Sequence, residues 1–165
     1  MIERVAVIGA GTMGHGIAAV SAMAGSQVAL ADSDPVACAA AMIRIGSTLD
    51  KAIERGKLAP GDRAAVLGRV RAAADVADAV HDAGLVIEAI PERLDLKQAL
   101  FAELERHAPA DAILATNTSS LSVSAIADHL HATLGGDTYV APALLRRMVA
   151  EGRLGRKSGQ GFYQW

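Results

Sequence analysis

The 165-residue sequence has few aromatic residues, one cysteine and no long uninterrupted apolar segment. Cys38 alone excludes an internal disulfide. Because it stands among alanines with no paired histidine or metal-ligand spacing, we expect a small buried helix residue and no metal site. No run approaches the roughly 20 apolar residues that cross a bilayer. The first apolar run is broken by glycines and preceded by Glu3, unlike a signal peptide, so we expect a cytoplasmic protein.

The sequence also lacks a large excess of either positive or negative charge. The formal net charge is −2, and lysine and arginine are scattered rather than clustered, so the sequence lacks the electrostatic footprint of a nucleic-acid or membrane partner. Small and apolar residues are abundant, with 52% hydrophobic residues and 16 glycines. This composition and length are typical of one soluble globular domain whose helices pack closely on a sheet.

Apolar runs and helical periodicities alternate along the chain up to about residue 130. The expected strands are 4–9, 27–31, one beginning at 69, 83–90 and 112–118, and the expected helices are 12–24, 35–55, a short one after 59–62, 94–107 and 122–129. This alternation favours an α/β fold, a Rossmann-like doubly wound parallel sheet with strand order about 3-2-1-4-5. The pattern then stops. Residues 131–143 are typical of a linker, and residues 144–165 predict a short helical C-terminal tail.

Glycines with the spacing Gly-x-Gly-x-x-Gly follow the first expected strand, at Gly9, Gly11 and Gly14. In this context Gly9 permits a tight turn, Gly11 lets the backbone approach a pyrophosphate, and Gly14 lets helix and strand pack closely. Thr12 and Met13 complete the turn, and the helix that follows directs its positive end at the phosphates. The alternative is that these are ordinary turn glycines.

An acidic residue, Asp32, ends the second expected strand. Its carboxylate is suited to accept hydrogen bonds from the adenosine ribose and to repel a 2′-phosphate. Ser33 and Asp34 follow, with no arginine to accept NADP, so NAD is the expected cofactor. The alternative is an ordinary turn or helix-capping acid.

Four segments carry a specific resemblance. They are VAVIGAGTMGHGIA at 5–18, LVIEAIPERLDLK at 85–97, ILATNTSSLSVSAIA at 113–127 and LLRRMVAEGRLGRKSGQGFY at 144–163. In order and spacing they resemble the NAD-dependent 3-hydroxyacyl-CoA dehydrogenase family, which includes the 3-hydroxybutyryl-CoA dehydrogenases. The resemblance implies oxidation of 3-hydroxyacyl-CoA to 3-oxoacyl-CoA in fatty-acid metabolism. It also implies an NAD-binding domain at 1–130 and a remnant of the family's C-terminal helical domain at 144–165.

The resemblance assigns roles to individual residues. It places Glu92 and Lys97 near the nicotinamide ribose, and Ser119 against the substrate oxygen or nicotinamide, with Asn117 shaping the same turn. It also makes Thr48 and Arg55 contacts for the CoA moiety. The alternatives are a solvated pair at a helix start for Glu92 and Lys97, a capping serine at 119, and an ordinary charged helix face for Thr48 and Arg55.

One part of the family pattern is missing. In the family the catalytic base is a histidine in a His-Phe-Phe-Asn-Pro segment after the NTSS turn, and this sequence has no such segment. Of its five histidines, only His129 and His131 lie near enough in sequence to approach Ser119, and both are expected on the surface. We therefore expect an NAD-binding family member with impaired or no turnover and weak or lost acyl-CoA binding. The alternatives are a non-catalytic NAD/CoA-binding module and a related NAD-dependent sugar-acid dehydrogenase.

The expected sheet also ends early. Its last strand, 112–118, would present an apolar edge with unpaired backbone groups, which proteins normally cover. The apolar side chains of residues 144–165 or a second copy of the chain are the candidates to cover it. A homodimer is expected, or else a poorly stable monomer.

Overall fold

A computed structural model describes residues 2–119, 123–135, 140, 143–153, 158–160 and 164. The chain divides into two compact units, Met1–Leu121 and Ser122–Trp165. Parts of the expected linker and tail lie outside the described residues, namely 136–139, 141–142, 154–157, 161–163 and 165.

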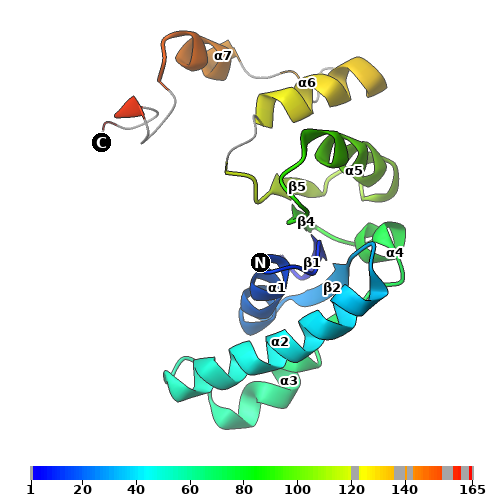
Figure 1. The fold of residues 1–165 in the computed structure, drawn as a ribbon, viewed down its shortest axis with the longest axis vertical. Coiled ribbons are helices and arrows are strands. Elements are labelled where there is room, and N and C mark those ends of the chain that lie inside the picture. Colours follow the sequence, from blue (N-terminus) through cyan, green and yellow to red (C-terminus); the bar gives the residue numbers. More distant parts are fainter. Residues whose placement is uncertain are drawn as a thin grey trace. The chain divides into compact units, whose positions relative to one another are not determined.

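The first unit contains a five-stranded parallel sheet with the order β3-β2-β1-β4-β5. Figure 1 labels β2, β1, β4 and β5 of this sheet. The strands are β1 (Arg4–Ile8), β2 (Gln27–Ala31), β3 (Val70–Ala72), β4 (Leu85–Glu88) and β5 (Ile113–Thr116). The α/β class and the expected strand order are confirmed. In β1 all residues after Arg4 are buried, as expected for a central strand of a parallel sheet covered on both faces.

The described residues of this unit form six helical segments. They are α1 (Gly14–Met23), α2 (Pro35–Glu54), the 3₁₀ turn η1 (Pro60–Asp62), α3 (Arg63–Leu67), α4 (Val76–Val80) and α5 (Leu94–His107). Helix α2 begins where expected, because the Asp34 carboxylate accepts from the Val36 N–H at 2.9 Å and Pro35 occupies the first turn. Helix α4 was not expected from the sequence. It is only five residues long, and the Asp75 carboxylate caps it by accepting from the Asp78 N–H.

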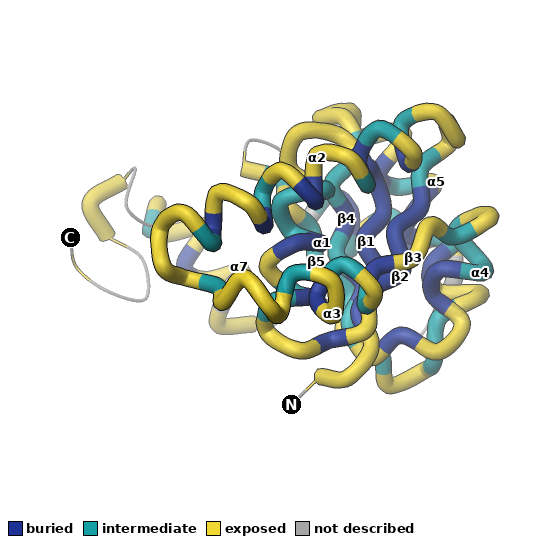
Figure 2. Tube along the Cα trace, turned by 90° about the horizontal axis from the view of Figure 1, so that it is seen from below, coloured by how far each residue is buried: buried dark blue, intermediate teal, exposed yellow. Residues whose placement is uncertain are grey.

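The main core lies where α1 and α2 pack on β1 and β2. It is built from small and branched apolar side chains, among them Val7, Ala18, Leu30, Ile45 and Leu49. In Figure 2 most of β1 and β2 is dark blue, the colour of buried residues. Alanines on α1 allow the helix to lie close to the sheet, which brings its first turn to the carboxyl end of β1.

Helices α2 and α3 are joined by a bidentate ion pair. The Arg63 Nε and Nη2 atoms donate to the two Asp50 carboxylate oxygens at 2.5 and 3.1 Å. The hydrogen bond from Arg63 lowers the pKa of the Asp50 carboxyl below its usual value of 3.8. The ion pair therefore stabilises the folded state fully at pH values above the usual pKa. This stabilisation is lost as the pH falls through the lowered pKa of the folded state.

Asp50→Asn should remove this contribution. We expect a slightly lower urea midpoint at neutral pH, and a shallower loss of stability as the pH falls below about 4, because one depressed carboxyl no longer takes up a proton on unfolding. Arg63→Gln should have the same effect, since it removes the partner. Denaturation series at several pH values would measure both, and unchanged acid slopes in both variants would contradict the assignment.

The second unit contains α6 (Val123–Leu134) and α7 (Ala143–Ala150). Helix α6 continues beyond the expected end near His129, so residues 131–134 are helical rather than linker. The sequence there contains no helix breaker before Gly135, whose φ of +73° suits the residue that follows a helix. Across the residues that the structure describes, no helix has the length and apolarity to cross a membrane.

Candidate functional site

A cavity of about 570 Å³ lies at the carboxyl ends of the strands. It is lined by Gly9, Gly11, Thr12, Met13, Asp32, Ser33, Ala89, Ile90, Pro91, Glu92, Lys97, Asn117 and Ser119. Because β1 lies between β2 and β4, the cavity opens at the point where the strand order reverses, which is where open α/β sheets bind ligands. Its volume is in the range of small-molecule sites.

The three glycines of the first turn have distinct surroundings. Gly9 has a φ of +105°, and a Cβ there would stand 2.6 Å from the Ala89 carbonyl oxygen. A Cβ on Gly14 would stand 1.7 Å from the Gly9 carbonyl oxygen, so this glycine permits the close contact of α1 with β1. A Cβ on Gly11 would meet no atom within 4 Å, because Gly11 faces the open cavity. Gly9 therefore stands in a tight turn and Gly14 in a close helix–strand contact, and the space over Gly11 is open.

The start of α1 leaves its positive end available. No side chain caps the helix at Met13, and its first turn contains no acidic residue. Gly11, Thr12 and Met13 line the cavity just before this helix. Helix N-termini of this kind bind phosphate through backbone N–H groups and the helix dipole.

Asp32 is held in a fixed orientation beside the glycine turn. Its Oδ2 atom accepts from the Ala10 N–H at 2.7 Å, and its Oδ1 atom accepts from the Asp34 N–H at 3.0 Å. The residue thus acts as a turn acid, which was the alternative interpretation, and it also lines the cavity. Each carboxylate oxygen can accept more than one hydrogen bond, so the two roles are compatible.

Arg44 is a residue near this turn that the sequence did not single out. It comes from α2, and its Nη2 atom donates to the Ala10 carbonyl oxygen at 3.1 Å. An arginine in a long amphipathic helix gives no signal of such a contact, because the partner lies 34 residues away in sequence.

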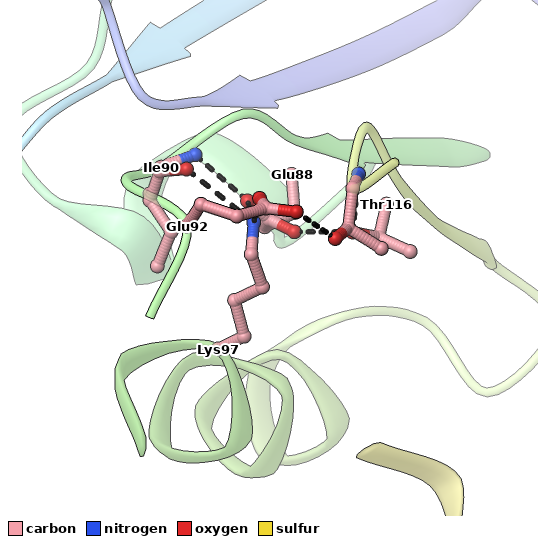
Figure 3. Close-up of polar contacts among 6 residues, drawn as sticks. Glu88, Ile90, Glu92, Lys97 and Thr116 are labelled. Carbon is pink, nitrogen blue, oxygen red and sulfur yellow. Dashed lines mark hydrogen bonds and ion pairs between the residues drawn. The ribbon is translucent and has the colours of Figure 1, made fainter. Parts of the chain in front are cut away.

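A buried ion pair lies at the other end of the cavity (Figure 3). Glu88 ends β4 with 0% side-chain exposure, and Lys97 on α5 is 1% exposed. The Lys97 Nζ atom donates to Glu88 Oε1 at 2.6 Å. Glu88 also accepts from the Ile90 N–H at 2.7 Å and from the Thr116 hydroxyl. The carboxylate is therefore satisfied by partners from α5, from β5 and from the loop that follows β4.

Glu92 joins this pair from the cavity side. Its Oε2 atom lies 3.3 Å from Lys97 Nζ, its Oε1 atom accepts from the Thr118 hydroxyl, and its side chain is 39% exposed. The alternative interpretation, a solvated Glu92–Lys97 pair at a helix start, is wrong for Lys97, because its side chain is buried. Glu88 was not predicted as a site residue, although an acidic residue at the end of the apolar run LVIE was a usable signal.

Asn117 and Ser119 follow β5 and line the same cavity. The Asn117 N–H donates to the Glu88 carbonyl oxygen at 2.8 Å, which ties this loop to the end of β4. Both side chains are exposed. The cavity thus brings together most of the predicted cofactor and substrate residues. They are Gly9, Gly11, Thr12, Met13, Asp32, Glu92, Lys97, Asn117 and Ser119. Gly14 packs against the Gly9 carbonyl group of the same turn.

Two predicted contacts do not line this cavity. Thr48 lies on α2 and donates its hydroxyl to the Arg44 carbonyl oxygen at 2.9 Å, and Arg55 is exposed at the end of the same helix. The histidines considered as substitutes for a catalytic base, His129 and His131, lie in α6 of the second unit.

A parallel sheet with a glycine turn, an uncapped helix start and an acid after the second strand defines the class of Rossmann dinucleotide-binding domains. The sequence comparison is more specific, because residues 4–142 match the family described as 3-hydroxyacyl-CoA dehydrogenase, NAD binding domain. The chain belongs to this family, as the resemblance of its four segments implied.

Individual relatives agree with this assignment. The chain is 41% identical over 150 residues to 3-hydroxyadipyl-CoA dehydrogenase of Escherichia coli, covering 90% of this chain and 31% of that protein. It is 41% identical over 127 residues to a 3-hydroxybutyryl-CoA dehydrogenase of Mycobacterium tuberculosis, covering 76% and 44%. A crystal structure of 3-hydroxybutyryl-CoA dehydrogenase from Escherichia coli is similar with a TM-score of 0.72 and 45% identity, covering 77% and 27%. The chain therefore spans less than half the length of these relatives.

Proposed function

We propose that the cavity binds NAD(H), with the adenosine half at Asp32 and the nicotinamide half toward Glu92 and Ser119. The observation that carries this proposal is the single cavity that joins the glycine turn, Asp32 and the Glu92–Lys97 pair. Dinucleotides lie across the strand-order reversal with their pyrophosphate at the first glycine turn. The NAD-binding description of the matched family supports the same choice.

The residues of the chain fit such a ligand. The open space over Gly11 allows a pyrophosphate to approach the backbone, and the uncapped start of α1 supplies N–H donors. Asp32 is positioned to accept from ribose hydroxyls. When bound, NAD would supply the hydride acceptor for oxidation of a secondary alcohol.

We further propose that this chain has little or no turnover with 3-hydroxyacyl-CoA. Its sequence contains no His-Phe-Phe-Asn-Pro segment, so the general base of the family pattern is absent. Loss of a general base costs about 10²–10⁴-fold in rate. A non-catalytic NAD-binding module is the second candidate function, and the same absence favours it.

Two measurements on the same preparation test these proposals. NADH fluorescence titration should show saturable binding, and NADH oxidation with acetoacetyl-CoA should be at least about 10²-fold slower than that of an ordinary dehydrogenase. Turnover at an ordinary rate would overturn the proposed loss of activity. Absence of NADH binding would overturn the proposed cofactor site.

Asp32→Asn should weaken NAD binding about tenfold, because it removes a charged acceptor of ribose hydrogen bonds. It should also reduce the discrimination against NADP, since the carboxylate no longer repels a 2′-phosphate. Ser33→Ala is the matched control, because it alters the next residue of the same cavity without changing charge. Titration of each variant with NADH and NADPH measures both effects, and equal discrimination in Asp32→Asn and the native chain would contradict the assignment.

We propose that the chain forms a homodimer. Strand β5 pairs with β4 on one side, and the residues that the structure describes place no further strand beside it. Its residues are not fully buried, and Ile113 is 56% exposed. An apolar strand edge of this kind favours pairing with another chain. Light scattering should give twice the chain mass, and a cooperatively unfolding monomer would contradict the proposal.

A further inference from the structure

Glu88, Lys97 and Glu92 form a group that we call the Glu88 cluster. It contains two carboxylates and one ammonium, which leaves one formal negative charge. Glu88 and Lys97 are almost completely removed from solvent, whereas Glu92 is 39% exposed. Charges in such an environment are screened less than surface charges, so they act over a longer distance.

The cluster lies at one defined end of the cavity. Asp32 marks the adenosine end because it follows β2, and the glycine turn after β1 marks the pyrophosphate. The remaining half of the cavity lies toward β4 and β5, where Glu92 and Lys97 line it. Figure 3 shows the polar contacts of these two side chains. If NAD(H) binds as proposed above, the nicotinamide half faces the Glu88 cluster.

The two redox forms of the nicotinamide differ in charge. The oxidised ring carries a formal positive charge, and the reduced ring is neutral. A fixed negative charge in a partly hydrated cavity therefore stabilises the oxidised form more than the reduced form. Lys97 alone would have the opposite effect, so the preference depends on the carboxylates that outnumber it.

We infer that Glu88 is a positioning residue that biases the cofactor site toward oxidised NAD. It holds the Lys97 ammonium beneath Glu92 and leaves the cluster with one net negative charge. This inference rests on the proposed function. It goes beyond that function because Glu88 touches no cofactor in this arrangement and acts through Lys97 and Glu92.

The hydrogen bonds around Glu88 support a positioning role. The Thr116 hydroxyl donates to Glu88, and the Asn117 N–H donates to the Glu88 carbonyl oxygen, so β5 and its loop are tied to the same residue. Lys97 also donates to the Ile90 carbonyl oxygen at 3.3 Å. The ammonium therefore has a fixed place between the two carboxylates. Stability alone does not require this arrangement, because buried ion pairs are often replaceable by apolar residues.

The test is the ratio of two dissociation constants, Kd for NAD⁺ divided by Kd for NADH. Glu88→Gln should raise this ratio about three- to tenfold, as expected when one unit charge is removed from a partly hydrated site. Thr116→Val is the matched control, because it removes a hydrogen bond to Glu88 and changes no charge. Both affinities are expected to fall together in this control, with the ratio unchanged.

Glu92→Gln is a second test variant, and it changes a partly exposed side chain rather than a buried one. Because Glu92 is part-exposed, the fold should tolerate the change, and the ratio should rise in the same direction. Proportional weakening of both nucleotides in Glu88→Gln and Glu92→Gln would show a purely structural role and would overturn the inference. If the native chain binds neither nucleotide, the proposed function fails first, and the inference fails with it.

Discussion

Replacing Gly14 with alanine is expected to destabilise the first unit by about 3 kcal/mol or more and to abolish dinucleotide binding. The new Cβ would lie 1.7 Å from the Gly9 carbonyl oxygen and 2.8 Å from its carbon. Gly9 has no room to move away, because its N–H donates to the Ala31 carbonyl oxygen at 2.8 Å and its own Cα faces Ala89. Helix α1 must therefore separate from β1. Urea denaturation and NADH titration measure the two effects.

Two other glycines of the same segment serve as controls. Gly16→Ala lies in α1, where a Cβ meets no atom within 4 Å, and it should stabilise the fold by about 1 kcal/mol. Gly11→Ala also meets no protein atom, so it should leave the fold intact and weaken dinucleotide binding only. An unchanged urea midpoint and NADH affinity in Gly14→Ala would refute this account of the turn.

Replacing Lys97 with methionine should cost about 3–5 kcal/mol of stability. Methionine retains much of the side-chain volume, so the loss comes from charge rather than from a cavity. The Glu88 carboxylate, at 0% exposure, would lose its ammonium partner and retain only the Ile90 N–H and Thr116 hydroxyl as donors. A buried carboxylate without a counter-ion is costly because water no longer solvates it.

A double variant distinguishes this explanation from general damage to α5. Lys97→Met combined with Glu88→Leu removes both charges, and most of the lost stability should return, since apolar replacement of a buried pair is often neutral. Arg93→Ala breaks the largely exposed pair with Asp95 near the start of the same helix and should have little effect. Additive losses in the double variant would contradict the buried-pair account.

Short sequence patterns were sufficient to predict the sheet and most of the residues that line the cavity. Alternating apolar runs and helical periods predict a parallel sheet, because each crossover helix has to return the chain to the same sheet. The strand order 3-2-1-4-5 is the one expected when a dinucleotide-binding glycine turn follows the first strand. The glycine turn and Asp32 are recognisable because their roles depend on neighbouring residues in sequence. The glycine turn, the start of the helix that follows it and the acidic residue after the second strand all occur within 30 residues of sequence.

Other features depend on residues far apart in sequence and were missed. Arg44 contacts Ala10 across 34 residues, and the Thr116 hydroxyl reaches Glu88 across 28. Helix α4 is too short for a periodic pattern. No local pattern distinguishes a buried Lys97 from a solvated one, since burial is decided by how α5 packs over the ends of β4 and β5.

The sequence by itself determined the fold class, the position of the glycine turn and the absence of the histidine segment typical of the family. These are properties of residue type and spacing along the chain, which do not depend on knowing which distant residues are in contact. Only the tertiary structure decided that Glu88 and Lys97 form a buried pair and that Glu92 joins them at the cavity. Their partners come from β4, α5 and β5, and the electrostatic effect of a charge depends on the solvent and neighbours that folding places around it.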